Sequence, residues 1–277
     1  MDNGLHFISG LPRSGSTLLA AILRQNSKIH AHMSSPVAPL VTQMWLTMGA
    51  GNEHSVFLDD AQRQDLLRSI FEAYYRTIHP EKIIFDTNRI WCAKLPMLTQ
   101  LFPQARLVCC VRDVPQILDS FERLHRSNPL LLSMMFSGDT ARTVYHRVEA
   151  LGGMNGVVGL AWHALREAYF GEFADRLILI DYDALTREPK ATLAFLYDKL
   201  NLPPYTHDFD NVVFDAADEF DRRFGLPDLH TVARKVQNVT RQSLLPPDLV
   251  ARYAQDAFWK NPESNIRNVS VLLAKPR

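Results

Sequence analysis

The residues whose chemistry stands out first gather near the N-terminus, in Gly10-Leu-Pro-Arg-Ser-Gly-Ser-Thr17. An apolar run at 5–8 precedes this segment, and a helical pattern begins at Ser16. A strand, a glycine-bearing loop and a helix N-terminus in this order bind phosphate. The free N–H groups of the first helical turn point at the anion, and the helix dipole favours negative charge. The two glycines have the G-x-x-x-x-G spacing of a P-loop, with the threonine where that motif ends.

The cation of this loop is displaced relative to a P-loop. Ser16 stands where a P-loop has its lysine, and Arg13 carries the positive charge inside the loop. The neighbouring Ser14, Gly15 and Thr17 add hydroxyl and backbone N–H donors. Together they form a cradle for an oxyanion, whereas a merely structural turn needs no such density of donors. We therefore predict that these five residues bind an anionic ligand.

A second candidate site lies at the end of the most apolar strand, residues 106–112. This strand is apolar on both faces, which is typical of a central, parallel strand. Arg112 ends it and so stands at the carboxyl edge of the sheet, where ligands bind in open α/β folds. Ser120 follows about two helical turns later, so both side chains can reach one anion. The alternative is that Arg112 pairs with a nearby acid, Asp113 or Asp119.

The elements that position these residues alternate between strand and helix. Strands are expected at 5–8, 82–86, 106–112 and 176–181, and helices at 16–25, 60–75, 96–102, 114–126, 159–173, 189–200 and 247–258. This alternation predicts an α/β fold with a doubly wound parallel sheet between two helical layers. We expect one domain, 1–277. A loop over the site at 26–39, a lid or insertion at 128–156 and a C-terminal extension at 203–277 that closes over the site complete it.

Composition bounds the function further. The 30 basic and 30 acidic residues cancel, so no global field favours a nucleic acid or an anionic membrane as partner. No apolar run approaches the ~20 residues of a membrane-spanning helix, and no basic-then-apolar leader is present. Cys92, Cys109 and Cys110 have no metal-ligand spacing and are interpreted as small buried hydrophobes in a reducing compartment. We predict a cytoplasmic protein without a metal site.

Three segments together resemble one family. Leu11 to Thr17 resembles the 5′-phosphosulfate loop of the sulfotransferases that use 3′-phosphoadenosine-5′-phosphosulfate (PAPS), and Val111 to Ser120 resembles their 3′-phosphate motif. Ile180-Asp-Tyr-Asp-Ala-Leu185 is similar to the segment whose tyrosine, here Tyr182, contacts the adenine. The three segments occur in the family's order. Because the loop carries arginine rather than lysine, the variant most similar to this chain is that of bacterial sulfotransferases akin to protein-tyrosine sulfotransferases.

The resemblance implies a P-loop-like fold and in-line transfer of a sulfuryl group from PAPS to an acceptor hydroxyl, with adenosine 3′,5′-bisphosphate leaving and no metal. Arg13 and Ser16 would stabilise the charge on the bridging oxygen, and Arg112 and Ser120 would hold the 3′-phosphate. Lys235, in a late basic segment, resembles a residue that closes over the nucleotide. The acceptor is a peptide tyrosine, a sugar or a small molecule, and neither it nor the oligomeric state follows from the sequence.

The chain departs from these relatives at two positions. Where many of them have a lysine that assists the leaving group, it has threonine in Asp86-Thr-Asn-Arg89, and Arg89 is the candidate substitute. Tyrosine-sulfating relatives carry a glutamate base in the loop after the first helix, where this chain has His32-Met-Ser-Ser-Pro36. His32 is the candidate base there, since imidazole titrates near neutral pH.

Two alternative functions stay open. A P-loop kinase needs an acid at the end of a buried strand to help hold Mg²⁺, and Asp181 occupies such a position. A non-catalytic adenine-nucleotide-binding protein on the same scaffold is the other alternative, because the lysine and the glutamate of the relatives are missing.

Overall fold

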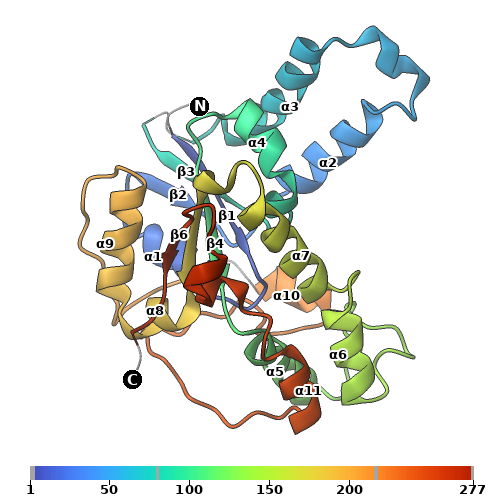
Figure 1. Cartoon of the computed structure of the whole chain (residues 1–277), viewed down its shortest axis with the longest axis vertical. Helices are drawn as coiled ribbons and strands as arrows, with labels where there is room; N and C mark the ends of the chain where they lie inside the picture. The colour runs from blue at the N-terminus through green and yellow to red at the C-terminus, as the bar shows by residue number, and fades with distance from the viewer. Residues whose placement is uncertain (1–3, 79–80, 215–217, 276–277) are drawn as a thin grey trace.

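All strands of the sheet run parallel, in the order β2-β3-β1-β4-β5-β6, in the computed structural model, which describes residues 4–78, 81–214 and 218–275 (Figure 1). The strands are β1 (Leu5–Gly10), β2 (Ile29–Ala31), β3 (Ile83–Thr87), β4 (Leu107–Val111), β5 (Leu177–Asp181) and β6 (Ser270–Leu272). The predicted α/β class is confirmed. Because all strands are parallel, their carboxyl ends meet at one edge of the sheet.

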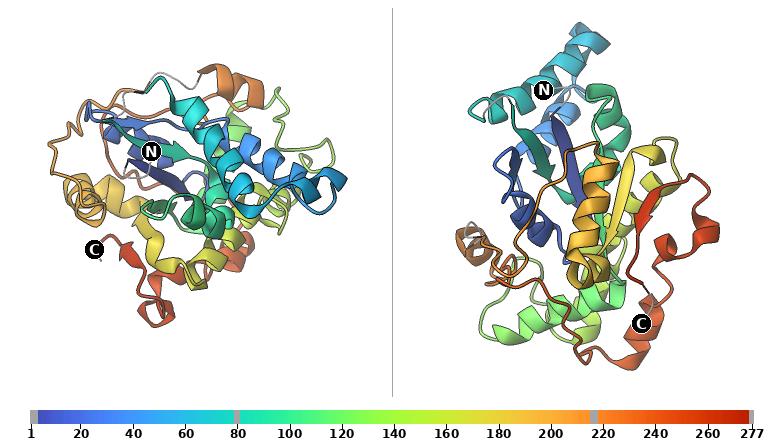
Figure 2. Two further views of the ribbon diagram at one scale, coloured as in Figure 1. Left: turned by 90° about the horizontal axis from the view of Figure 1, so that it is seen from above. Right: turned by 90° about the vertical axis from the view of Figure 1, so that its left-hand side faces the viewer.

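Helices cover both faces of the sheet (Figure 2). They are α1 (Ser16–Leu23), α2 (Val37–Thr47), α3 (Asp60–Tyr75), α4 (Leu95–Leu101), α5 (Val114–Ser127), α6 (Val144–Gly152), α7 (Val157–Phe170), α8 (Tyr182–Arg187), α9 (Pro189–Lys199), α10 (Asp218–Phe224) and α11 (Pro247–Tyr253). Two hydrophobic clusters result, one with α1 and α9 and one with α3, α4, α5 and α7. Neighbouring strand residues face opposite layers, so Cys109 packs in one cluster and Cys110 in the other.

The expected loop at 26–39 is wrong in two places. Residues 29–31 form the edge strand β2, which pairs with β3 through Ile29 and Ile83. Helix α2 then begins at Val37 and buries Val37, Ala38 and Val41. A three-residue strand is too short to show a periodic pattern, and the surrounding His, Ser and Pro residues are typical of loops. The C-terminal strand β6 was missed for the same reason of length.

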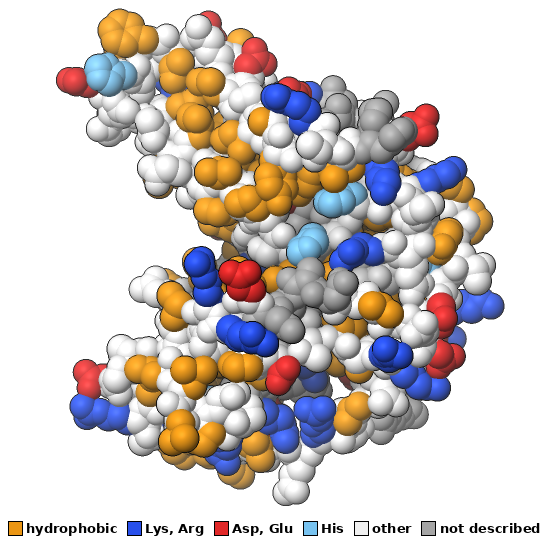
Figure 3. All heavy atoms as spheres, turned by 180° about the vertical axis from the view of Figure 1, so that it is seen from behind, with side chains coloured by type: hydrophobic (Ala, Val, Ile, Leu, Met, Phe, Trp, Pro, Cys, Tyr) orange, Lys and Arg blue, Asp and Glu red, His pale blue; other side chains and the backbone are white. Residues whose placement is uncertain are grey.

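Helices α2 and α3 extend from the body of the protein as an arm (Figure 1). Its surface carries exposed hydrophobic side chains, among them Leu40, Trp45, Leu46, Val56 and Phe57. Figure 3 shows hydrophobic side chains on the arm above a hollow in the molecular surface. Among the described helices, none has the length and apolarity needed to cross a membrane.

The segment 128–156, expected as a lid or insertion, contains α6 and is fixed to α5 by a buried ion pair. Arg147 donates from Nε and Nη2 to the two carboxylate oxygens of Glu122, at 2.8 and 2.7 Å. Glu122 is 2% exposed and Arg147 8%. Nearer the start of the same segment, Met134 donates its backbone N–H to the carbonyl oxygen of Phe224 in α10 at 3.0 Å.

Candidate functional site

A cavity of about 1070 Å³ opens at the carboxyl edge of the sheet. Its walls are the loop after β1, the residues that follow β3 and β4, the start of α8 and much of the segment 229–243. The sequence-predicted residues that line it are Arg13, Gly15, Ser16, Thr17, Arg89, Arg112, Ser120, Tyr182 and Lys235. Parallel topology therefore brings the three predicted motifs to one place.

The turn from β1 to α1 requires glycine at two positions because of its backbone conformation. Gly10 has φ 98°, and a Cβ there would lie 2.2 Å from the carbonyl oxygen of Cys110. Gly15 has φ 95°, and a Cβ there would meet the Tyr182 ring at 3.0 Å. Both residues lie in the left-handed region that favours glycine. Arg13, at φ 57°, adopts a left-handed backbone without that freedom, a conformation that the surrounding loop must hold in place.

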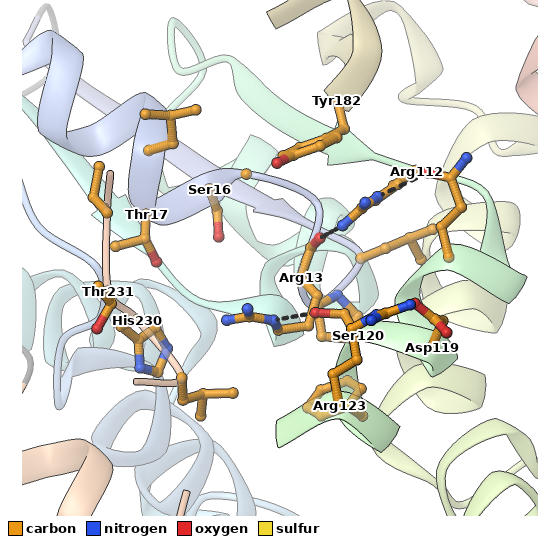
Figure 4. A pocket seen from close by; sticks show the side chains of 18 of the residues that line it. Arg13, Ser16, Thr17, Arg112, Asp119, Ser120, Arg123, Tyr182, His230 and Thr231 are labelled. Atoms are coloured by element: carbon orange, nitrogen blue, oxygen red, sulfur yellow. Dashed lines mark hydrogen bonds and ion pairs between the residues drawn. The ribbon is translucent and has the colours of Figure 1, made fainter. Parts of the chain in front are cut away.

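Ser14 anchors this loop to strand β4. Its side chain is fully buried, and its hydroxyl hydrogen-bonds with the carbonyl oxygens of Leu11 and, at 2.8 Å, Cys110. The hydroxyl is thus engaged by carbonyl groups of the protein, and Ser14 is absent from the cavity lining formed by the described residues. Ser16 and Thr17, at the N-terminus of α1, line the cavity (Figure 4).

Direct contacts join the motifs. Arg13 donates from Nε to Ser120 Oγ at 3.0 Å, across 107 positions of sequence. Arg112 donates from Nη1 to the carbonyl oxygen of Arg13 at 3.2 Å and from Nε to Gln116 Oε1 at 3.0 Å (Figure 4). The Arg112 guanidinium also lies over the Tyr182 ring, 4.1 Å from its centroid. Such cation–π contacts orient both partners.

The simpler interpretation of Arg112, pairing with a nearby acid, does not hold. Asp113 pairs with Lys260 at 2.5 Å. Asp119 pairs with Arg123 at 2.7 Å and also accepts the backbone N–H of Leu244. Both acids are thus engaged by other groups, while Arg112 borders the cavity.

The cavity is electropositive. Burial, and then the charge of Arg112, lower the pKa of Arg13 to about 10. Burial likewise lowers the pKa of Arg112, and the nearby Arg241 adds to the effect. Like charges held together in a partly desolvated place favour a bound anion, which relieves their repulsion. The basic side chains that line the cavity are Arg13, Arg89, Arg112, Arg123, Arg187, Lys235 and Arg241, against Asp119 and Asp183.

Two residues at the carboxyl end of β3, Thr87 and Arg89, also line this space. Thr87 lines the cavity, and among the described residues its buried Oγ1 finds no hydrogen-bond partner. Arg89 begins the short 3₁₀ helix Arg89–Lys94 and lines the cavity as well. Surrounding protein lowers the pKa of Arg89 through desolvation. Asp86, the residue immediately before Thr87, faces the opposite side of the strand and is fully buried.

His32, the candidate base, is absent from the cavity lining formed by the described residues. His32 follows the edge strand β2 and packs against the Phe214 ring, with centroids 5.7 Å apart. The next two residues, Met33 and Ser34, line the cavity instead.

Lys235, by contrast, does line the cavity. Its Nζ lies 2.8 Å from Asp210 Oδ1, and this contact raises the pKa of the lysine.

Two cavity residues were missed in the sequence, His230 and Arg241. Both belong to the segment 229–243, which has little regular secondary structure. His230 contacts the carboxylate of Asp221 in α10, with Nδ1 and Oδ1 2.5 Å apart. The C-terminal extension that contains them was expected to close over the site, but a histidine and an aspartate nine positions apart form no recognisable motif, so these two residues were not singled out.

Comparisons with known proteins agree with this architecture. The profile of the sulfotransferase family matches residues 6–207. Protein-tyrosine sulfotransferase 1 of Homo sapiens is 29% identical over 118 residues, which cover 40% of this chain and 32% of that protein. The Danio rerio protein of the same name is 28% identical over 118 residues, 40% of this chain and 33% of that protein. The match thus spans about a third of the length of these curated relatives.

A solved sulfotransferase from Alicyclobacillus acidocaldarius shares the fold. Its TM-score is 0.53, with 14% sequence identity over 98% of this chain and 96% of that one. The family profile covers most of the chain, including the loop after β1 and the residues after β4 and β5 that meet at the cavity. The chain belongs to the sulfotransferase family.

Proposed function

We propose that this protein transfers a sulfuryl group from PAPS to an acceptor hydroxyl. The observation that carries the proposal is the contact between Arg13 and Ser120, which joins the segment resembling a phosphosulfate loop to the segment resembling a 3′-phosphate site. A donor with phosphate groups on both the 3′ and 5′ positions matches two linked anion sites. The electropositive cavity provides room and charge for it.

Each end of the donor has candidate partners. The loop N–H groups, Ser16 and Thr17 would hold the phosphosulfate at the N-terminus of α1. Arg112 and Ser120 would bind the 3′-phosphate, and Tyr182 would contact the adenine. Arg241 and Lys235 are further candidate cations for the nucleotide, on the segment 229–243 that lines the cavity.

The reaction forms a bond between the acceptor oxygen and sulfur and breaks the bond from sulfur to the bridging oxygen. The electron pair of the broken bond leaves with adenosine 3′,5′-bisphosphate. Negative charge grows on the bridging oxygen, so fixed donors aimed at that oxygen lower the barrier. Arg13, Ser16 and Arg89 are our candidates for this role, and Thr87 adds a buried hydroxyl beside them.

A kinase reaction is the second candidate, and the geometry supports it less. The acid that would help to hold Mg²⁺, Asp181, is 4% exposed and accepts the backbone N–H of Asp183 at 2.9 Å, as the cap of α8. Asp181 is absent from the cavity lining formed by the described residues.

As acceptors we propose peptide tyrosines, sugars or small hydroxyl compounds. Tyrosine is included because the relatives are named protein-tyrosine sulfotransferases.

A ligand panel tests the donor. Adenosine 3′,5′-bisphosphate without Mg²⁺ should raise the thermal unfolding midpoint, whereas Mg·ATP should raise it much less. PAPS and a panel of tyrosine peptides, glycans and phenols should then yield acceptors with one added sulfate, detected by mass spectrometry. Stabilisation by Mg·ATP alone would instead support the kinase. Stabilisation by the bisphosphate with no transfer to any acceptor would support a non-catalytic binding protein.

A further inference from the structure

His230 lines the same cavity as the phosphosulfate loop, although it lies in the C-terminal third of the chain. Figure 4 shows its ring turned toward the space that Arg13 and Thr17 also border. The side chain is 19% exposed, so it is held by protein yet open to a ligand. An edge-to-face contact with the Phe220 ring, at 5.5 Å between centroids, limits its rotation.

Asp221 fixes the orientation of this ring. One carboxylate oxygen accepts the backbone N–H of His230 at 2.8 Å, and the other lies 2.5 Å from ring Nδ1. Because a carboxylate only accepts hydrogen bonds, it favours the tautomer with the proton on Nδ1. The lone pair of a neutral imidazole then resides on Nε2, which is free of this contact and can accept a proton.

The charges around His230 come from three elements. Asp221 of α10 is negative, whereas Arg13 of the loop after β1 and Arg89 after β3 are positive. Burial lowers the pKa of His230 below its usual value, Asp221 opposes this shift, and the two arginines add to it. The net lowering keeps the imidazole neutral near pH 7, the state that a base requires.

From this geometry we propose that His230 is the general base of the transfer, and that Asp221 is its positioning residue. The proposal rests on the proposed function. Nε2 takes the proton of the acceptor hydroxyl while the acceptor oxygen bonds to sulfur. The bond from sulfur to the bridging oxygen breaks, and adenosine 3′,5′-bisphosphate leaves with its electron pair. The imidazolium formed is stabilised by the Asp221 carboxylate and later loses its proton to solvent.

The other candidate bases are poorly placed. His32 packs against the Phe214 ring and is absent from the cavity lining formed by the described residues. The Asp86 carboxyl is fully buried and accepts hydrogen bonds from Ser35, Tyr75 and Trp91 at 2.6, 2.6 and 2.8 Å. These three hydrogen bonds hold Asp86 in the protein core, and it is absent from the cavity lining formed by the described residues.

Two variants test the role. His230→Asn retains an amide that can donate to Asp221 but has no group to replace Nε2. Asp221→Asn can donate to Nδ1, which favours the tautomer protonated on Nε2 and so removes the basic site. We expect both to bind adenosine 3′,5′-bisphosphate within about threefold of wild type by calorimetry, which also reports folding. With a tyrosine peptide and PAPS, kcat should fall about 10²- to 10⁴-fold for His230→Asn.

His146→Asn is the matched control. His146 also uses ring Nδ1 for a local contact, with Thr143 Oγ1 at 3.0 Å, but it lies exposed on α6. This variant should keep wild-type kcat.

Acceptor acidity separates a base from a merely structural side chain. An acceptor that is already ionised near neutral pH, such as 4-nitrophenol, needs no base, so His230→Asn should lose far less kcat with it than with the tyrosine peptide. In wild type, log kcat should rise with pH through a midpoint below 6.5, the usual pKa of histidine, and level off above that midpoint. This rise should vanish in His230→Asn.

The possible results discriminate between the two proposals. Transfer by wild type together with an unchanged kcat and pH profile in His230→Asn would overturn the role of His230 alone. Equal losses with 4-nitrophenol and the tyrosine peptide would also overturn it. Absence of transfer by the wild-type protein to every acceptor would overturn the proposed function, and the role of His230 with it.

Discussion

Arg13 Nε and Ser120 Oγ lie 3.0 Å apart and connect the loop after β1 to helix α5. The left-handed backbone of Arg13 aims this side chain across the cavity, and Arg112 holds the Arg13 carbonyl from the other side. The two proposed anion sites are therefore one hydrogen-bonded unit before any ligand binds. Binding energy is then not spent on ordering the side chains.

The first prediction concerns the 3′-phosphate. Arg112→Ala should weaken adenosine 3′,5′-bisphosphate binding about ten- to a hundredfold, since a charge-assisted hydrogen bond contributes roughly 1.5–3 kcal/mol. Adenosine 5′-monophosphate, which lacks the 3′-phosphate, should bind nearly as it does to wild type. Calorimetric titration of both nucleotides measures this difference. Arg142→Ala, at an exposed ion pair with Asp139, is the control. Equal losses for the two nucleotides would refute the assignment of Arg112.

The second prediction concerns the shape of the loop. Gly15→Ala should lower the free energy of unfolding by about 1–3 kcal/mol, because alanine is strained at φ 95°. Its Cβ should also push against the Tyr182 ring and weaken nucleotide binding. Gly51→Ala is the matched control, since nothing lies within 4 Å of a Cβ there. Urea unfolding and calorimetry measure the two effects. A Gly15→Ala protein as stable as Gly51→Ala would contradict the loop geometry.

The third prediction concerns acid stability. His6 is 7% exposed in β1 and accepts the backbone N–H of Arg106 through Nδ1 at 3.1 Å. Burial, followed by the charge of Arg106, lowers the pKa of His6 from 6.5 to about 4. Between these two pH values the unfolded chain binds the proton more tightly, so stability falls as the pH drops from 6.5 to 4. The loss should approach about 3 kcal/mol.

Urea unfolding at pH 7 and pH 4.5 tests this expectation. His6→Asn keeps an acceptor for the Arg106 N–H but does not titrate, so its stability should depend less on pH. The same pH dependence in His6→Asn and wild type would place the acid sensitivity elsewhere.

The fourth prediction concerns the anchor of the segment 128–156. Glu122→Ala should lower the free energy of unfolding by about 3–5 kcal/mol, because it leaves the Arg147 guanidinium buried and unpaired. Arg126→Ala removes the other partner of the same carboxylate, but that arginine is 50% exposed. Its loss should cost less than about 1 kcal/mol. Similar losses in the two variants would show that the buried pair is not the anchor.

The sequence allowed prediction of the parts of the fold with strong local signals. Strands β4 and β5 are continuous apolar runs, and a strongly polar residue follows β4, so Arg112 was expected at the carboxyl edge of the sheet, where it lies. Tyr182 was expected at the site from the family resemblance instead. Short elements carry too little pattern, which is why β2 and β6 were missed.

The direction of individual side chains could not be predicted from the sequence, nor could most of the residues that the C-terminal extension contributes to the cavity. Ser14 counted as one of several hydroxyls in the loop, and only the three-dimensional structure shows it bonded to the Cys110 carbonyl below. His230 reaches the cavity through an irregular segment tied to α8, where Asn238 donates to Asp183 Oδ1 at 2.9 Å and to Thr186 at 3.1 Å. Contacts of this kind depend on tertiary packing and leave no local pattern.

The most direct test of the account is a transfer assay with PAPS labelled in its sulfuryl group, without Mg²⁺ and with a tyrosine peptide or phenol as acceptor. We predict that label appears on the acceptor oxygen in a one-to-one ratio with released adenosine 3′,5′-bisphosphate, and that Arg13→Ala reduces both together. Release of the nucleotide with no label on any acceptor, or no consumption of PAPS at all, would contradict the account.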